Sequence, residues 1–216
     1  MIKLKKINLY HLDYPLKNYV ITSFGFMKSR PALILELTDI HGNIGLGEIW
    51  CNFPADGASY KFNLFKNIFA NKLFNSNIKH PKDLNLIYEL IKTIFVQSDD
   101  LGSYNSILSA IDCAYWDLIA KKKKTPLNKL MNKKSSNNIE VYASGINSNS
   151  AIKNIIDARL LGIKYFKIKT GIDNKLDKNL IERIFKIRKS YEKIMLDINQ
   201  GWDFKSANSY IKKINK

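Results

Sequence analysis

Segments with strand-like and helix-like patterns alternate regularly over the C-terminal part of the chain. β-Branched and apolar residues predict three strands, and apolar residues spaced three and four apart predict a helix after each strand. The predicted strands cover residues 139–145, 164–170 and 193–199, and the predicted helices cover 151–161, 177–191 and 204–214. Short connections of this kind favour right-handed crossovers between neighbouring parallel strands. The C-terminal part is therefore predicted to be an α/β unit on a parallel sheet.

The N-terminal part has a different pattern. Its first 50 residues are predicted to form strands, with a hairpin turn at 39–43. Helices are predicted over 60–70, from Pro81 onward and over 103–120. The last of these carries the small residues Ala110, Cys113 and Ala114, which would let another element pack closely against it. This part is therefore predicted to be an α+β domain.

A polar segment separates the two parts. Residues 133–138 contain no apolar residue, which is typical of a linker. We therefore place the domain boundary there, with one domain over 1–134 and the second over 135–216.

The charge of the chain is strongly positive. A net charge of +16 results from 35 Lys and Arg residues against 19 Asp and Glu residues, but only four of the cations are arginine. Nucleic-acid-binding proteins favour arginine and gather their cations on one face, whereas the lysines here are spread over the whole chain. A compositional bias explains the charge better, and a nucleic-acid-binding module is the weakest alternative.

The sequence also bears on location. It has no run of about 18 uncharged apolar residues, so we expect no membrane-spanning helix and no membrane partner. The first residues lack the apolar stretch of a secretion signal. Cys51 and Cys113 lie far apart, without the spacing of a metal site or a disulfide framework. A cytoplasmic protein is expected.

Polar side chains occupy one face of two neighbouring predicted strands. Lys167 and Lys169 alternate with apolar residues on the second strand, and Asp197 and Asn199 do so on the third. Parallel strands are usually apolar on both faces, so matched polar positions indicate a site. If the apolar positions face outer helices, the four polar side chains line the interior of a barrel at its C-terminal mouth, where barrel active sites lie.

These residue types suit one kind of chemistry. A lysine with a pKa near about 10.4 is a poor base at neutral pH, but a second ammonium group nearby is expected to lower that pKa. A carboxylate beside the lysines supplies a hard oxygen ligand for a divalent metal. A lysine base combined with a metal is the arrangement needed to remove a proton next to a carboxylate and to stabilise the resulting enediolate.

Four motifs together resemble a known family. They are Gly-Leu-Gly-Glu at 45–48, the helix segment 109–118, Lys-Ile-Lys at 167–169, and Leu-Asp-Ile-Asn-Gln-Gly-Trp at 196–202. In this order, and over essentially the whole chain, they resemble the mandelate racemase and muconate lactonizing enzyme branch of the enolase superfamily. The resemblance implies an N-terminal α+β capping domain followed by the first part of a modified TIM (β/α) barrel.

The resemblance also implies roles for individual residues of the barrel part. Lys169 would be the proton-abstracting base, and Lys167 would tune it and contact the substrate carboxylate. Asp197 would be the first of three carboxylate ligands to an essential Mg²⁺ ion. Asn199 would be a polar neighbour of that site that contacts substrate, and Ser144 on the first barrel strand would approach substrate.

The capping domain of this family supplies specificity loops. By resemblance these loops lie near residues 22–26 and 50–54, with Phe24 and Trp50 as candidate substrate-binding residues. Ordinary domain packing accounts for such aromatic residues equally well. The family also implies a homo-oligomer.

The implied activity is magnesium-dependent abstraction of the proton alpha to a carboxylate in the complete parent enzyme. An acid-sugar dehydratase or racemase acting on a small carboxylate or acid sugar is the first expectation, and a muconate-type cycloisomerase is a weaker one. The chain contains only three strand–helix units of the barrel, so the other metal ligands and a second acid/base group are expected downstream. The alternative is a catalytically inactive, truncated fragment with only a capping or assembly role, and its open sheet edges would favour self-association.

Overall fold

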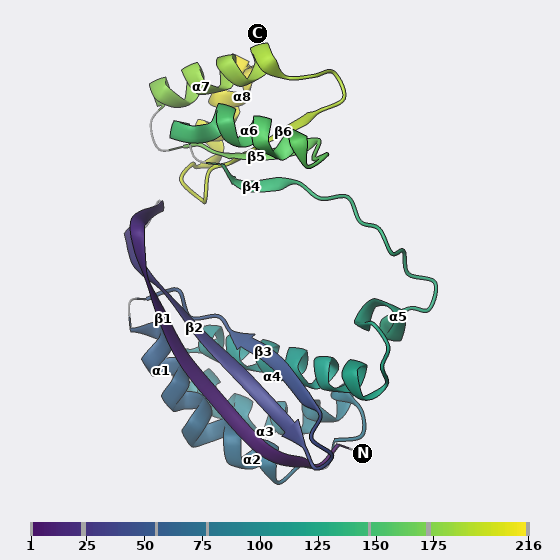
Figure 1. Ribbon diagram of the computed structural model, residues 1–216. Helices are drawn as coiled ribbons and strands as arrows, with labels where there is room; N and C mark the ends of the chain where they lie inside the picture. The colour runs from purple at the N-terminus through teal and green to yellow at the C-terminus, as the bar shows by residue number, and fades with distance from the viewer. Residues whose placement is uncertain are drawn as a thin grey trace. The chain divides into compact units, whose positions relative to one another are not determined.

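The computed structural model describes residues 2–22, 25–54, 56–76, 78–146, 148–171 and 174–214. The chain divides into two compact units, each of which is visible in Figure 1. The first comprises residues 1–19 and 27–135, and the second comprises 20–26 and 136–216. No helix among the described residues is long and apolar enough to cross a membrane.

The first unit combines a three-stranded sheet with helices on one of its faces (Figure 1). The strands β1 (Leu4–Thr22), β2 (Gly25–Asp39) and β3 (Ile44–Ile49) lie in the order β1-β2-β3, and β2 pairs antiparallel with β3. The longer helices are α1 (Gly57–Leu64), α3 (Leu84–Gln97) and α4 (Leu101–Lys122). Shorter segments are a π-helical turn (Phe65–Phe69), α2 (Ala70–Phe74), a 3₁₀ turn (Pro81–Asp83) and α5 (Leu127–Met131). The predicted helix over 60–70 thus comprises the end of α1, the π-helical turn and the first residue of α2.

Two glycines let α4 pack directly on β3. A Cβ atom at Gly45 would lie 2.0 Å from the carbonyl oxygen of Ala114, and one at Gly47 would lie 2.0 Å from that of Ala110. The prediction that Ala110 and Ala114 permit close packing is confirmed. It is wrong for Cys113, whose side chain is exposed because it lies on the outer face of α4. The glycine and alanine motifs of the sequence therefore belong to one helix–strand contact.

The second unit is a parallel sheet in the order β4-β5-β6, as the alternating pattern predicts. Its strands are β4 (Ala143–Ile146), β5 (Tyr165–Lys169) and β6 (Lys193–Asp197), and its helices are a 3₁₀ turn (Ser148–Ser150), α6 (Ala151–Leu160), α7 (Asn174–Ile187) and α8 (Phe204–Ile214). Phe166 and Ile168 are fully buried against apolar residues of α6 and α7. The apolar face of β5 therefore packs against the helices.

All three predicted strands are longer than the observed ones, the second by one residue at each end. The first begins at Ala143 rather than at 139, because Ala143 pairs with Phe166 and β5 starts only one residue before Phe166. Ile139 is 87% exposed as a result. The third strand ends at Asp197 because Asn199 takes a left-handed conformation with φ of 44°.

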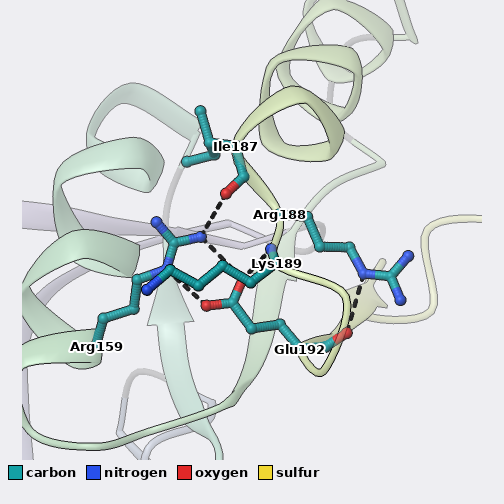
Figure 2. A network of polar contacts seen from close by, with 5 residues as sticks. All are labelled: Arg159, Ile187, Arg188, Lys189 and Glu192. Atoms are coloured by element: carbon teal, nitrogen blue, oxygen red, sulfur yellow. Dashed lines mark hydrogen bonds and ion pairs between the residues drawn. The ribbon is translucent and has the colours of Figure 1, made fainter.

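A buried ion pair fixes the chain just before β6. Glu192 is 1% exposed, and its two carboxylate oxygens accept hydrogen bonds from Nε and a terminal nitrogen of Arg159 at 2.6 and 2.8 Å. Figure 2 shows that Arg159 also donates to the carbonyl of Ile187 (2.7 Å), while Glu192 accepts from the backbone N–H of Lys189 (2.9 Å). The bond from Arg159 holds the pKa of Glu192 below its usual range. The helix predicted over 177–191 therefore ends at Ile187, because Arg159 binds the carbonyl of Ile187 and Glu192 binds the N–H of Lys189.

Candidate functional site

The polar face of β5 and β6 lies opposite the core of the second unit. Phe166 and Ile168 point to the helices, so the alternation of side chains turns Lys167 and Lys169 to the other face. The register places Lys169 directly opposite Asp197 at the C-terminal ends of the two strands. The sheet therefore determines which side chains meet.

One carboxylate oxygen of Asp197 contacts the ammonium groups of two lysines. Oδ2 of Asp197 lies 3.3 Å from Nζ of Lys167 and 3.2 Å from Nζ of Lys169. Lys169 also donates to Oδ1 of Asn199, and the backbone N–H of Asn199 donates to Oδ1 of Asp197 at 3.1 Å. The four side chains predicted to meet do meet, while the roles given to them stay predictions. We refer to these four residues as the lysine–aspartate cluster.

The electrostatics of the cluster differ from the expectation. Burial raises the pKa of Asp197, but the hydrogen bond from Asn199 and the ammonium groups of Lys169 and Lys167 outweigh it, and the pKa lies below its usual value. The hydrogen bond to Asp197, followed by the contact with Tyr142, raises the pKa of Lys167. The expectation that a second ammonium group lowers the pKa is therefore wrong for Lys167, because a carboxylate lies between the two cations.

Tyr142 is a neighbour of the cluster that the sequence analysis missed. Nζ of Lys167 lies over its ring, 5.2 Å from the ring centre. Tyr142 immediately precedes β4 and is two residues from Ser144, on the same alternating face. That spacing was the signal that could have identified it.

The structure gives less support to Ser144 as a site residue than to the lysine–aspartate cluster. It lies on β4 and is exposed. None of the contacts described joins its side chain to the lysine–aspartate cluster. Its proposed approach to substrate stays a prediction.

The two aromatic candidates are Phe24 and Trp50, for which the resemblance implies a place in specificity loops. Phe24 lies outside the described residues. Trp50 follows β3 and is 51% exposed. Its carbonyl accepts a hydrogen bond of 2.7 Å from Nζ of Lys61, and the same Nζ lies 5.0 Å from the centre of the Trp50 ring. Burial lowers the pKa of Lys61, a residue that the sequence analysis did not single out.

The described residues do not by themselves make a magnesium site. Magnesium needs near-octahedral oxygen coordination, and among the described residues no group of three or more His, Cys, Asp or Glu could hold a metal ion. Asp197 is one carboxylate, and its oxygens contact two ammonium groups and a backbone N–H. Two cations beside one carboxylate oppose a divalent metal ion.

Comparison with known proteins identifies one family model and several similar proteins. The family model for the mandelate racemase / muconate lactonizing enzyme N-terminal domain matches residues 6–132. The L-Ala-D/L-Glu epimerase of Francisella tularensis subsp. novicida (strain U112) is 27% identical over 222 aligned positions, which cover 100% of this chain and 59% of that protein.

Solved structures agree with this assignment. A mandelate racemase/muconate lactonizing enzyme from Bordetella bronchiseptica RB50 is 27% identical with a TM-score of 0.85, over 99% of this chain and 56% of that one. A dipeptide epimerase from Enterococcus faecalis V583, complexed with Mg and the dipeptide L-Leu-L-Tyr, has the same fold, with a TM-score of 0.77 at 23% identity over 99% of this chain and 58% of that one. The chain thus spans a little over half the length of these relatives.

The predicted fold class is confirmed. The first unit is the N-terminal capping domain of the enolase superfamily, and the second is the first part of a barrel-type parallel sheet. The family model matches more than half of the chain. The chain therefore belongs to the mandelate racemase / muconate lactonizing enzyme family of the enolase superfamily.

Proposed function

We propose that the protein containing this chain removes the proton alpha to a carboxylate and returns a proton to the same carbon, as a racemase or epimerase does. The observation that carries the proposal is the convergence of Lys167 and Lys169 on Oδ2 of Asp197 at the C-terminal ends of adjacent parallel strands. The family and the epimerase relatives support the reaction type.

In this proposal Lys169 is the base. Its neutral amine takes the alpha proton, and Asp197 and Asn199 then accept hydrogen bonds from the ammonium group that forms. A base held by two oxygen acceptors has its direction fixed, which general base catalysis requires. Lys167 remains an ammonium group and contacts the carboxylate of the substrate.

The proposed substrate is a carboxylate derived from an amino acid, and a dipeptide in particular. The Francisella relative is an L-Ala-D/L-Glu epimerase, and the Enterococcus structure holds a dipeptide. These relatives favour a dipeptide over the acid sugar that the motifs led us to expect, and epimerisation over dehydration or cycloisomerisation.

Magnesium enters the proposal only through Asp197. Its carboxylate would be one ligand, and the ion would supply counter-charge for the developing enediolate. The remaining ligands would come from residues other than those described. A cytoplasmic location and a homo-oligomeric state likewise stay predictions.

Substrate turnover tests the proposal. The protein expressed from its complete reading frame would be incubated with magnesium and L-Ala-L-Glu, and the epimer formed would be separated by chromatography. Matched incubations would contain an acid sugar. Formation of the epimer of the dipeptide supports the proposal, and conversion of the acid sugar alone would contradict it.

A further inference from the structure

We infer that Tyr142 is a positioning residue for Lys167, whose ammonium group it holds with the face of its ring. The inference rests on the proposed function in one respect, the contact of Lys167 with the substrate carboxylate. The positioning itself is a property of the second unit and is open to test without any turnover.

The backbone places Tyr142 on the correct face. Ala143 pairs with Phe166 and packs against the core of the second unit, so it points to the helices. Side chains alternate along an extended chain, and Tyr142 therefore lies on the same face as Lys167. Nζ of Lys167 then lies 5.2 Å from the centre of the ring, within the range of a cation–π contact.

The charges of the cluster explain why a second partner is needed. Asp197 offers one negative charge, and both ammonium groups approach the same oxygen at 3.3 and 3.2 Å. Lys169 has a further acceptor in Oδ1 of Asn199. Lys167 has Tyr142, whose ring centre lies 5.2 Å from Nζ and whose hydroxyl also contacts the ammonium group. Each lysine thus has its own second partner, and this keeps the two ammonium groups apart.

The same face holds a second pair of this kind. Lys193 of β6 lies directly opposite Tyr165 of β5, with its Nζ 5.4 Å from the centre of the Tyr165 ring. Branched apolar side chains usually fill the interior layers of a TIM barrel. Lysine–tyrosine pairs at two levels of this face indicate that the aromatic rings are placed for cations. Tyr165 also provides a control position that does not touch the cluster.

The consequence for the site is specific. Without the ring, Lys167 keeps only its contact with the Asp197 oxygen that Lys169 also contacts. The position of its ammonium group is then no longer fixed. Binding of the substrate carboxylate weakens, whereas proton abstraction by Lys169 is retained. Replacement of Tyr142 should therefore raise KM and leave kcat nearly unchanged.

The first test measures the contact directly by NMR on the 216-residue chain with ¹³C-labelled lysine. Protons over an aromatic ring face are shifted upfield, and Lys167→Arg identifies the Lys167 signals. The upfield shift of the Lys167 ε-methylene should disappear in Tyr142→Leu, persist in Tyr142→Phe and persist in Tyr165→Leu. Tyr142 is 48% exposed, so its replacement leaves the buried core intact, and circular dichroism checks this. An unchanged Lys167 signal in Tyr142→Leu would overturn the inference.

The second test separates the inference from the proposed function. In the protein from the complete reading frame, Tyr142→Leu should raise KM for the dipeptide several-fold at a nearly constant kcat, and Tyr142→Phe should restore KM. A fall in kcat at constant KM would contradict the positioning role. If the wild-type protein converts no dipeptide while the NMR shifts behave as expected, the proposed function fails and the placement of Lys167 by Tyr142 stands.

Discussion

Nζ of Lys169 lies 3.2 Å from Oδ2 of Asp197, a residue 28 positions further along the chain. The two residues are direct register partners on adjacent parallel strands. A crossover through α7 separates them in sequence, and the sheet brings them back together at its C-terminal edge. The candidate site thus follows from the strand order and from the alternation of side chains.

The buried pair of Arg159 and Glu192 should be important for stability. Removal of one partner from a buried ion pair costs about 3–5 kcal/mol, because the other charge stays buried without compensation. We expect Glu192→Gln to lower the free energy of unfolding by an amount of this order, as measured by urea denaturation. Glu182→Gln, which breaks an exposed pair with Lys178, is the control and should cost less than about 1 kcal/mol. Equal effects of the two changes would contradict a stabilising role for the buried ion pair of Arg159 and Glu192.

The same pair predicts a pH dependence. The pKa of Glu192 is lowered in the folded state from its ordinary value of 4.5, so its contribution is fully present above that pH and is lost as the pH falls through the folded pKa. The difference in unfolding free energy between the wild type and Glu192→Gln should therefore shrink as the medium is acidified. A difference that stays constant down to strongly acidic pH would show that Glu192 is not stabilised as the anion.

Close packing of β3 against α4 predicts a strong effect at Gly47. A Cβ atom there would lie 2.0 Å from the carbonyl oxygen of Ala110, so strand or helix must shift. Gly47→Ala should lower the unfolding free energy by about 1–3 kcal/mol or more. Gly102 lies in α4 with open space around it, and Gly102→Ala should be neutral or stabilising, by up to about 1 kcal/mol. Thermal unfolding of the two variants tests this contrast, and a stable Gly47→Ala protein would contradict the packing.

Much of the second unit could be predicted from its sequence. The alternation of polar and apolar residues in 165–169 and 193–197 predicted that Lys167, Lys169 and Asp197 lie on one face of the sheet. The local sequence pattern is enough for this prediction. Its spacing from Ser144 also put Tyr142 on this face, but its contact with Lys167 depends on where β4 starts against β5, which is a matter of pairing between strands. The sequence did not reveal the ion pair of Glu192 either, because its partner Arg159 lies 33 residues earlier on another element.

Metal binding by the 216-residue chain should be negligible. Asp197 is the one carboxylate of the lysine–aspartate cluster, and both lysines add positive charge beside it. Isothermal calorimetry with magnesium should therefore show no saturable heat for the chain or for its Asp197→Asn variant. Tight binding that Asp197→Asn abolishes would mean that residues other than those of the cluster complete the site.

Exchange of the alpha hydrogen with solvent tests the central claim most directly, because it follows the proton that Lys169 is proposed to take. The protein from the complete reading frame would be incubated with the dipeptide and magnesium in D₂O, and loss of the alpha-proton signal would be followed by NMR. Lys169→Ala should slow this exchange by about 10²–10⁴-fold, the usual contribution of a general base. Lys178→Ala, which removes an exposed lysine of α7, should exchange like the wild type. Exchange in Lys169→Ala at the wild-type rate would contradict the assignment of Lys169 as the base.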